Sequence, residues 1–270
     1  MSADPKVAPS PEPPYVLREQ TGGLVRLTLN RPERFNPLSS AMIAALQVAL
    51  DEIARDPDAR VVVLAAGGKG FSAGHDLKEM RAHFGDEAWQ RRLFDDCSRL
   101  MMTLTRMPQP VIARVHGIAT AAGCQLVSTC DLAVASDAAT FALPGVNVGI
   151  FCTTPAVGVA RNVARKRVME MLLTGRPIDA PTALAWGLVN RVVPAAGLDA
   201  AVQDFADAIL SKSPAVIGAG KRTFYDQIDR SLGGAYDIAG PAMTRGALLE
   251  DAAEGIDAFL QKRPANWRGR

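Results

Sequence analysis

The chain has 270 residues and is 48% hydrophobic, which suffices for one large domain with a substantial core. Its formal net charge of +2 gives no indication of a nucleic-acid partner, and no apolar run approaches the roughly 20 residues of a membrane span. The four cysteines form no CxxC pair, and the histidines and cysteines lack metal-ligand spacing. We therefore expect a cytoplasmic protein with reduced thiols, no membrane span and no metal site.

Residues 1–14 are rich in proline and mixed in charge, which is typical of a disordered N-terminal arm. They lack the apolar segment of a signal peptide and the Arg-rich, acid-poor character of a transit peptide.

Strand and helix patterns alternate over residues 15–196. Apolar side chains at Val25, Leu27 and Leu29 alternate with polar ones and predict a half-buried strand. A helix with one apolar face follows, beginning at Ser39 or Ser40, and a longer helix is predicted around residues 89–104. Further buried strands are predicted at Arg60–Ala66, Val111–Val115, Leu132–Ser136 and Gly187–Val193. This alternation predicts an α/β core with a mainly parallel sheet.

The last part of the chain, residues 197–270, reads as a helical region, with a boundary near Pro194–Leu198. No strand pattern occurs from Asp199 onward. Helices are predicted near Ala200–Leu210, Pro214–Asp229, Pro241–Leu249 and Asp251–Arg263.

Two stretches, Phe71–Met80 and Gly117–Asp131, each have the pattern of a strand, a turn of small residues and the start of a helix. Such a turn leaves backbone N–H groups free to bind a developing negative charge. Two turns of this kind could together form an oxyanion hole.

The run Gly70–Gly74 also satisfies G-x-S-x-G, the nucleophile motif of serine hydrolases. That motif needs a histidine later in the chain, and no histidine follows His116. The small residues around Ser72 are better explained by a ligand that approaches the backbone closely.

The chain resembles the enoyl-CoA hydratase/isomerase (crotonase) superfamily in five motifs, in that family's order and spacing: FSAGHDLKEM, VHGIATAAGCQLVSTCDLAVASD, FALPGVNVG, MEMLLTGRPIDAPTALAWGLVNRVV and GIDAFLQKR. The resemblance runs from about Val16 to Trp267. It implies a spiral of strand–strand–helix repeats and a helical trimerisation region, in a homotrimer or a hexamer built as a dimer of trimers. It also implies acyl-CoA or enoyl-CoA as substrate or ligand, with no further cofactor, and a lyase or isomerase of fatty acid metabolism.

The resemblance also implies the site residues. The N–H groups of His75 and Ala122 match the oxyanion-hole positions, although the family usually has glycine at the second. The positions implied to contact CoA are Ser72, Ala73, Gly74, Asp76 and Leu77, with Arg34 and Asn36 nearby, and Phe259 and Lys262 from a neighbouring subunit.

The chain departs from the family at the two glutamates that transfer protons in its hydratases. Their positions hold Gln125 and Gly145. An amide can hold a water but cannot exchange a proton near pH 7, and glycine has no side chain. Each positioned acid or base is typically worth about 10²–10⁴ in rate, so we expect hydration of ordinary 2-enoyl-CoA to be very weak or absent.

Two alternatives to an enoyl-CoA hydratase/isomerase stay open. The first is a non-catalytic CoA-thioester binder or a partner of active paralogues. The second is an acyl-CoA thioester hydrolase in which Gln125 or the Cys152–Thr154 loop positions water. For His75, a proton-transfer role is an alternative to packing, and Asp76 reads as a helix N-terminal residue.

Overall fold

Two β-sheets form the framework of the molecule in a computed structural model, which describes residues 13–270. In the larger sheet the strand order is β1-β2-β3-β5-β7-β10, and only β1 runs antiparallel to its neighbour. Its strands are β1 (Val16–Thr21), β2 (Leu24–Leu29), β3 (Val61–Ala66), β5 (Val111–Val115), β7 (Leu132–Ser136) and β10 (Arg191–Val193). The smaller sheet contains β4 (Gly70–Ser72), β6 (Ile118–Thr120), β8 (Thr140–Ala142) and β9 (Ile178–Asp179).

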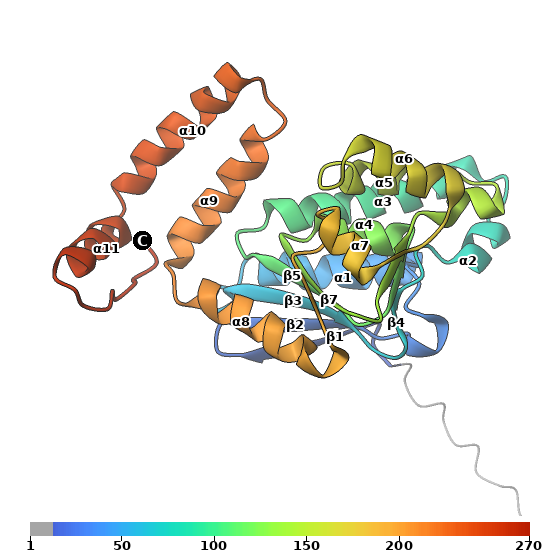
Figure 1. The fold of residues 1–270 in the computed structure, drawn as a ribbon, viewed down its shortest axis with the longest axis horizontal. Helices are drawn as coiled ribbons and strands as arrows, with labels where there is room; N and C mark the ends of the chain where they lie inside the picture. The colour runs from blue at the N-terminus through green and yellow to red at the C-terminus, as the bar shows by residue number, and fades with distance from the viewer. Residues whose placement is uncertain (1–12) are drawn as a thin grey trace, which may run out of the picture.

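The chain passes three times from the larger sheet to the smaller one and then into helical structure. The order β3-β4-α2 is repeated as β5-β6-α4 and again as β7-β8 followed by α5. Because β4, β6 and β8 are parallel neighbours, the segments that follow them leave the smaller sheet at the same edge. This strand–strand–helix repeat confirms the predicted α/β spiral (Figure 1).

Eleven α-helices belong to the described residues. Those of the core are α1 (Ser40–Ile53), α2 (Leu77–Ala82), α3 (Glu87–Arg106), α4 (Ala122–Thr129), α5 (Thr153–Val159), α6 (Arg165–Thr174), α7 (Ala180–Ala185) and α8 (Leu198–Leu210). The last three are α9 (Pro214–Gln227), α10 (Leu232–Ala247) and α11 (Glu250–Leu260). Several begin at a side chain that accepts a backbone N–H: Ser39 caps α1 and Asp76 caps α2.

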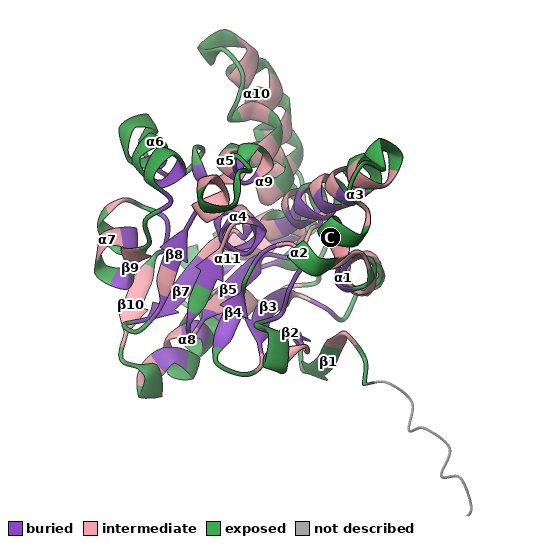
Figure 2. Cartoon of the chain, turned by 90° about the vertical axis from the view of Figure 1, so that its right-hand side faces the viewer, coloured by how far each residue is buried: buried purple, intermediate pink, exposed green. Residues whose placement is uncertain are grey.

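The larger sheet is buried on both faces, as its near-continuous apolar strands predict. Val62 and Leu64 of β3 belong to the main core, whereas Val61 and Val63 point to the other face. There they pack against Leu198, Val202 and Ala206 of α8. Helix α8 therefore packs with the core sheet, although the predicted boundary at residues 196/197 precedes it. Figure 2 shows the buried strands between partly exposed helices.

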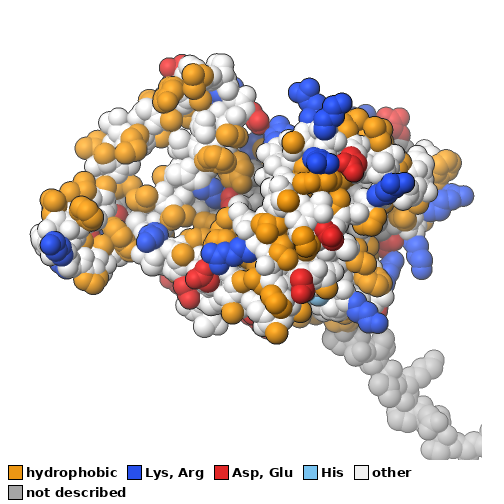
Figure 3. Space-filling model, viewed as in Figure 1, with side chains coloured by type: hydrophobic (Ala, Val, Ile, Leu, Met, Phe, Trp, Pro, Cys, Tyr) orange, Lys and Arg blue, Asp and Glu red, His pale blue; other side chains and the backbone are white. Residues whose placement is uncertain are grey.

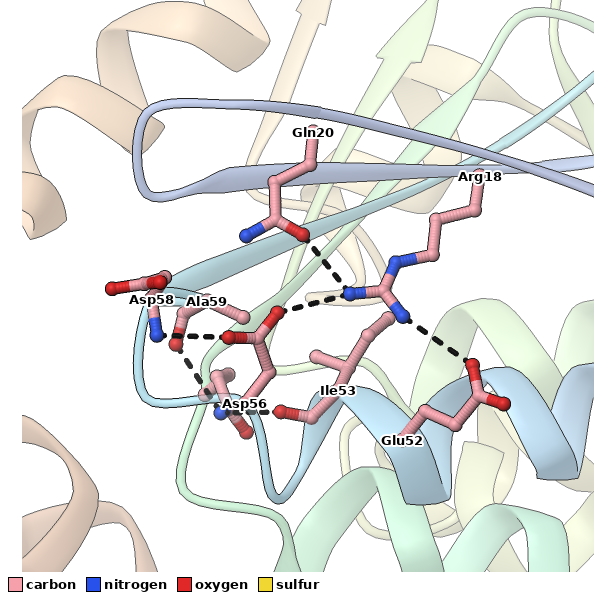
Figure 4. A network of polar contacts seen from close by, with 8 residues as sticks. Arg18, Gln20, Glu52, Ile53, Asp56, Asp58 and Ala59 are labelled. Atoms are coloured by element: carbon pink, nitrogen blue, oxygen red, sulfur yellow. Dashed lines mark hydrogen bonds and ion pairs between the residues drawn. The ribbon is translucent and has the colours of Figure 1, made fainter.

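The edge strand β1 is held to the end of α1 by polar contacts. Arg18 lies 3.0 Å from Asp56 and 3.4 Å from Glu52, and its guanidinium also donates to Gln20 (Figure 4). The sequence VLREQT of β1 has no apolar alternation, so periodicity does not predict this strand. Its backbone pairing with β2 and these charges stabilise it instead.

Helices α9, α10 and α11 form an arm that extends away from the two sheets (Figure 1). Lys221 of α9 anchors the arm, since its Nζ lies 2.6 Å from Asp131 and donates to the carbonyls of Leu104 and Gln109. This ammonium is only 6% exposed. By contrast, α10 has no buried residue.

Three details differ from the expectations. Helix α10 begins at Leu232 rather than at Pro241, because the Ser231 hydroxyl accepts the Gly234 N–H and starts the helix upstream. Strand β10 is shorter than Gly187–Val193 because Gly187 has a positive φ of 85°. The disordered arm expected at 1–14 lies mostly outside the described residues, and the carbonyls of Pro13 and Pro14 accept hydrogen bonds from Arg31.

Within residues 13–270, no helix combines the length and the apolar character that a bilayer span requires.

Candidate functional site

The two small-residue turns found in the sequence touch each other. Gly74, in the turn after β4, has a φ of +84°, and a Cβ placed on it would lie 2.8 Å from the Ala121 Cβ and 3.2 Å from the Ala122 nitrogen. These distances are too short for a side chain. Glycine at position 74 is therefore required both by its backbone angle and by the neighbouring turn.

A second glycine brings helix α4 onto strand β4. A Cβ on Gly123 would lie only 2.4 Å from the carbonyl oxygen of Ser72. Between the two contacts, Ala121 has φ 49° and ψ −120°, a conformation that costs a residue with a side chain about 1–3 kcal/mol. The turn keeps this strained backbone because the surrounding packing fixes it.

The strained turn leaves two backbone N–H groups without acceptors. Ala122 is the first residue of α4, and His75 follows Gly74 in the other turn. Neither N–H donates to an acceptor among residues 13–270. Free donors on two touching turns are suited to an oxygen that carries or develops negative charge.

The imidazole of His75 lies in a defined orientation. Its Nδ1 is 3.1 Å from the Leu38 carbonyl oxygen, and its ring packs edge-on against Phe94 with centroids 5.4 Å apart. Burial lowers the pKa of His75 below its usual range, against smaller raising effects of the Leu38 carbonyl and Glu79. The ring is therefore neutral near pH 7, and its Nε2 is buried without a partner.

Gln125 lies one helical turn after Ala122. Its side chain is buried, with 5% exposed, and its Oε1 has no hydrogen-bond partner. Because residues three apart share one face of a helix, Gln125 lies on the Ala122 face of α4. The amide has no titratable proton to offer at this position.

Gly145 occupies a position that leaves no room for a side chain. It lies in the 3-10 turn Pro144–Val148, and a Cβ on it would lie 2.2 Å from the Ile150 carbonyl oxygen and 2.9 Å from the Cys152 sulfur. The Ile150 N–H donates to the Gly145 carbonyl, and the Gly145 N–H donates to Cys152 Sγ. The loop packs so closely against the Gly145 backbone that only glycine fits at this position.

Ser72 and Asn36, both implied as ligand contacts, have structural hydrogen bonds. The Ser72 hydroxyl is buried and donates to the Asn36 carbonyl at 2.9 Å. The Asn36 amide donates to the carbonyls of Gly67 and Gly70 and accepts the Arg31 N–H. These bonds fix the turn before β4 and argue against a nucleophilic Ser72.

Asp76 and Arg34 form an ion pair beside the first turn. The Arg34 guanidinium lies 2.6 Å from the Asp76 carboxylate, which also accepts the N–H groups of Lys78 and Glu79. The predicted helix N-terminal role of Asp76 is confirmed. Ala73 and Leu77 are exposed on either side of Gly74 and His75.

Phe259 and Lys262 are not brought to the turns within one subunit. Phe259 is 82% exposed on α11, and Lys262 follows the end of that helix. Helix α11 lies at the opposite end of the molecule from α2 (Figure 1). A contact of these residues with a ligand at the turns would require a second subunit.

The cysteines of the described residues are free and buried. Burial raises the pKa of the Cys97 and Cys124 thiols to about 12 and also raises that of Cys152. A thiol with a raised pKa is a poor nucleophile at pH 7, which argues against the Cys152 alternative. No cluster of three possible metal ligands occurs within residues 13–270.

One carboxylate beside the site was missed by sequence reasoning. Glu79 of α2 accepts the Ser40 N–H at 2.9 Å and so stabilises the start of α1. The negative charge of Glu79 raises the pKa of His75, although by less than burial lowers it. The signal available in the sequence was the spacing Asp76-x-x-Glu79, which is a capping box with Asp in place of Ser or Thr.

The fold and the turns agree with comparisons with known proteins. The family model described as enoyl-CoA hydratase/isomerase matches residues 19–270. The human enoyl-CoA hydratase domain-containing protein 3, mitochondrial, is 46% identical over 256 residues, or 95% of this chain and 84% of that protein. The resemblance to the enoyl-CoA hydratase/isomerase superfamily that the sequence motifs indicated is thereby confirmed.

Solved structures give the same result. An enoyl-CoA hydratase structure from Mycobacterium smegmatis matches with a TM-score of 0.93 at 50% identity, covering 94% of this chain and 99% of that chain. The human enoyl-CoA hydratase domain-containing protein 3 matches with a TM-score of 0.91 at 46% identity, covering 94% and 100% of the two chains. The predicted fold with its helical C-terminal region is confirmed.

The packing around Gly145 predicts that Gly145→Ala destabilises the fold. The added methyl group meets backbone and sulfur atoms that cannot both move freely, so we expect a loss of about 1–3 kcal/mol in the free energy of unfolding. Urea unfolding followed by circular dichroism measures it. Gly233→Ala is the control, because a Cβ at this exposed position of α10 meets open space and should be neutral or stabilising. Equal stability of Gly145→Ala and wild type would contradict the prediction.

Proposed function

The chain belongs to the enoyl-CoA hydratase/isomerase family, and from that membership we propose that it binds an acyl-CoA or enoyl-CoA thioester. The thioester carbonyl oxygen accepts hydrogen bonds from the N–H groups of His75 and Ala122. The observation that carries the proposal is that these two donors have no acceptor among residues 13–270 and lie on touching turns. No cofactor besides the CoA group is needed.

The CoA portion lies along the backbone of Ser72–Leu77 in this proposal. The Arg34–Asp76 pair and the Asn36 amide are already bonded within the protein, so they shape the turn and leave backbone groups for the ligand. Arg34 keeps nearly half of its side chain exposed and can meet a phosphate on its open side. Ala122 keeps the N–H of the usual glycine while narrowing the site by a methyl group.

Proton transfer is the part of hydratase chemistry for which the site is poorly equipped. Gln125 has no proton to exchange, and the Gly145 loop leaves no space for a carboxylate. The second candidate function, a non-catalytic thioester binder or a partner of active paralogues, is favoured by this close packing. A thioester hydrolase in which Gln125 or the Cys152–Thr154 loop positions water stays a further alternative, because the raised pKa of the buried Cys152 thiol argues only against that thiol as a nucleophile.

A cytoplasmic location stays a prediction. The human relative is named mitochondrial, which describes that protein. The lyase or isomerase activity and a place in fatty acid metabolism are likewise proposed from family membership alone.

Assembly into a homotrimer, or a hexamer of two trimers, is proposed from the helical arm. A groove of about 1430 Å³ between α9, α10 and α11 is lined by apolar residues that include Tyr236, Met243 and Phe259. These three side chains are 70–82% exposed. Hydrophobic side chains gather along the arm in Figure 3, as expected for a surface that another subunit covers.

Hydration of crotonyl-CoA tests the catalytic half of the proposal. We expect a rate at least about 10²-fold below that of a family member with both glutamates, because proton transfer lacks its carboxylates. The loss of absorbance of the enoyl thioester on hydration measures it. Gln125→Glu alone should recover little, since Gly145 supplies no second group. A wild-type rate close to that of such a relative would contradict the proposal.

Removal of one N–H donor tests the binding half. Ala122→Pro removes this N–H at the first helical position, and circular dichroism checks that the variant folds, because proline also restricts the strained Ala121 before it. We expect the affinity for butyryl-CoA to fall about tenfold, and the affinity for free CoA, which has no thioester carbonyl, to change less than about threefold. Isothermal titration calorimetry measures both. Equal effects on the two ligands would refute the assigned role of the N–H.

A charge placed on the arm tests the assembly. Wild type should elute in light-scattering chromatography at three or six times the chain mass of 28.7 kDa. Met243→Glu should shift the population toward monomer because it introduces a charge into the apolar groove. Val48→Glu, on the exposed side of α1, is the matched control and should leave the mass unchanged. A monomeric wild type would exclude the assembly.

A further inference from the structure

The chain comes back, in residues 264–270, to the point where the helical arm leaves the core. The arm begins between α8 and α9, at residues 211–213, and runs out along α9 and back along α10 (Figure 1). Residues 264–270 follow α11 and form neither helix nor strand. The Trp267 indole among them donates its Nε1–H to the Ser211 carbonyl at 2.7 Å. The end of the arm is therefore attached to its beginning.

Asp251 of α11 is the centre of this attachment. Its carboxylate is buried, with 1% exposed. The hydroxyl of Ser213, at the start of α9, donates to Oδ2 at 2.5 Å. From the other side, the N–H groups of Arg268 and Gly269 donate to Oδ1 and Oδ2 at 2.7 and 2.9 Å. One buried carboxylate thus joins α11, the start of α9 and residues 264–270, and removing it leaves these donors without their acceptor.

Close packing and a second carboxylate attach the same residues further along α11. A Cβ placed on Gly255 would lie 3.1 Å from the Trp267 ring, so glycine lets the indole lie directly on the helix. Arg263 turns back to Glu254 with two charge-assisted hydrogen bonds of 2.7 and 2.9 Å. The Glu254 carboxylate also accepts the Asn266 N–H at 2.7 Å. The return of the chain is therefore held at both Asp251 and Glu254.

Helix α11 has little else to fix its orientation within one subunit. Its buried residues are Asp251 and Ala258, so half of its burial belongs to the attachment itself. The preceding helix, α10, has no buried residue. Ser213, Asp251 and Trp267 also line the apolar groove of the arm, so the attachment forms part of the wall of that groove.

We propose that residues 264–270 are a latch that holds α11 against the start of α9 and keeps the groove in the form that a second copy of the chain recognises. This rests on the proposed assembly. The latch acts inside one subunit, through Asp251 and Trp267, and positions Phe259 and Lys262 for the neighbouring subunit. Opening it frees α11 while the sheets and α8 stay folded, because α8 packs on the larger sheet through its own apolar side chains.

Hydrogen–deuterium exchange on the full-length protein tests the latch within one subunit. Trp267→Leu and Asp251→Ala are each combined with Met243→Glu, so that contacts between subunits do not protect the arm. Amides of residues 250–260 should exchange about tenfold faster than in Met243→Glu alone, whereas those of β3 and β5 should change less than about twofold. Trp267→Phe keeps the ring, loses the Nε1–H and should give a smaller effect. Equal acceleration in the arm and the sheets, or none in α11, would overturn the proposal.

Light-scattering chromatography over a range of protein concentrations tests the consequence for assembly. In the otherwise wild-type chain, Trp267→Leu and Asp251→Ala should raise the concentration of half-dissociation about tenfold. Arg268→Ala is the matched control, because this side chain is 64% exposed and the backbone N–H keeps its bond to Asp251. Dissociation of both latch variants at the wild-type concentration would also contradict the proposal. A monomeric wild type refutes the assembly and this consequence, and the exchange experiment then decides the latch by itself.

Discussion

The contact between two backbone turns is the constraint on which the rest of the site depends. Gly74 lies against Ala121 and Ala122, and Gly123 lies against the Ser72 carbonyl, so that neither position can carry a side chain. The strained backbone at Ala121 is held in place by this packing. This turn lies at the start of α4, and the Ala122 N–H has no acceptor among residues 13–270. Ser72 and Asn36 support the same geometry from the other side through their buried hydrogen bonds.

In the proposed function, the two turns supply backbone donors suited to polarising a carbonyl, whereas the positions of the family's two glutamates hold no carboxylate. A backbone N–H is present whatever the side chain, so position 122 keeps its donor with alanine in place of the family's usual glycine. Carboxylates do depend on the side chain, and the chain has an amide at Gln125 and a closed loop at Gly145. The loop matters as much as the substitution: the Ile150 carbonyl lies where a side chain from position 145 would begin. The proposed binding therefore depends on backbone groups, whereas hydratase chemistry would depend on side chains that these two positions lack.

The helical arm differs physically from the core. Helix α8 buries Leu198, Val202 and Ala206 against the sheet, whereas α10 buries nothing within the subunit. Helix α10 also contains Pro241 and several glycines, which lower its intrinsic stability as an isolated helix. Its packing against α9 and the anchoring of α9 through Lys221 and Asp131 hold the arm on the core. The exposed apolar groove is the feature on which the proposed assembly with other copies of the chain rests.

The sequence by itself determined the alternation of the main buried strands with helices, the helix start at Asp76 and the two small-residue turns. These features depend on local periodicity, on short-range hydrogen bonds and on glycine, all of which can be read from neighbouring residues. It also showed through Gln125 and Gly145 that the usual carboxylates are missing. Only the tertiary structure decided which polar groups stay unpaired. The orphan atoms of His75 and Gln125, the closed loop around Gly145 and the packing of α8 on the sheet depend on contacts between residues far apart in the chain. Such contacts leave no periodic signal, so no local pattern predicts them.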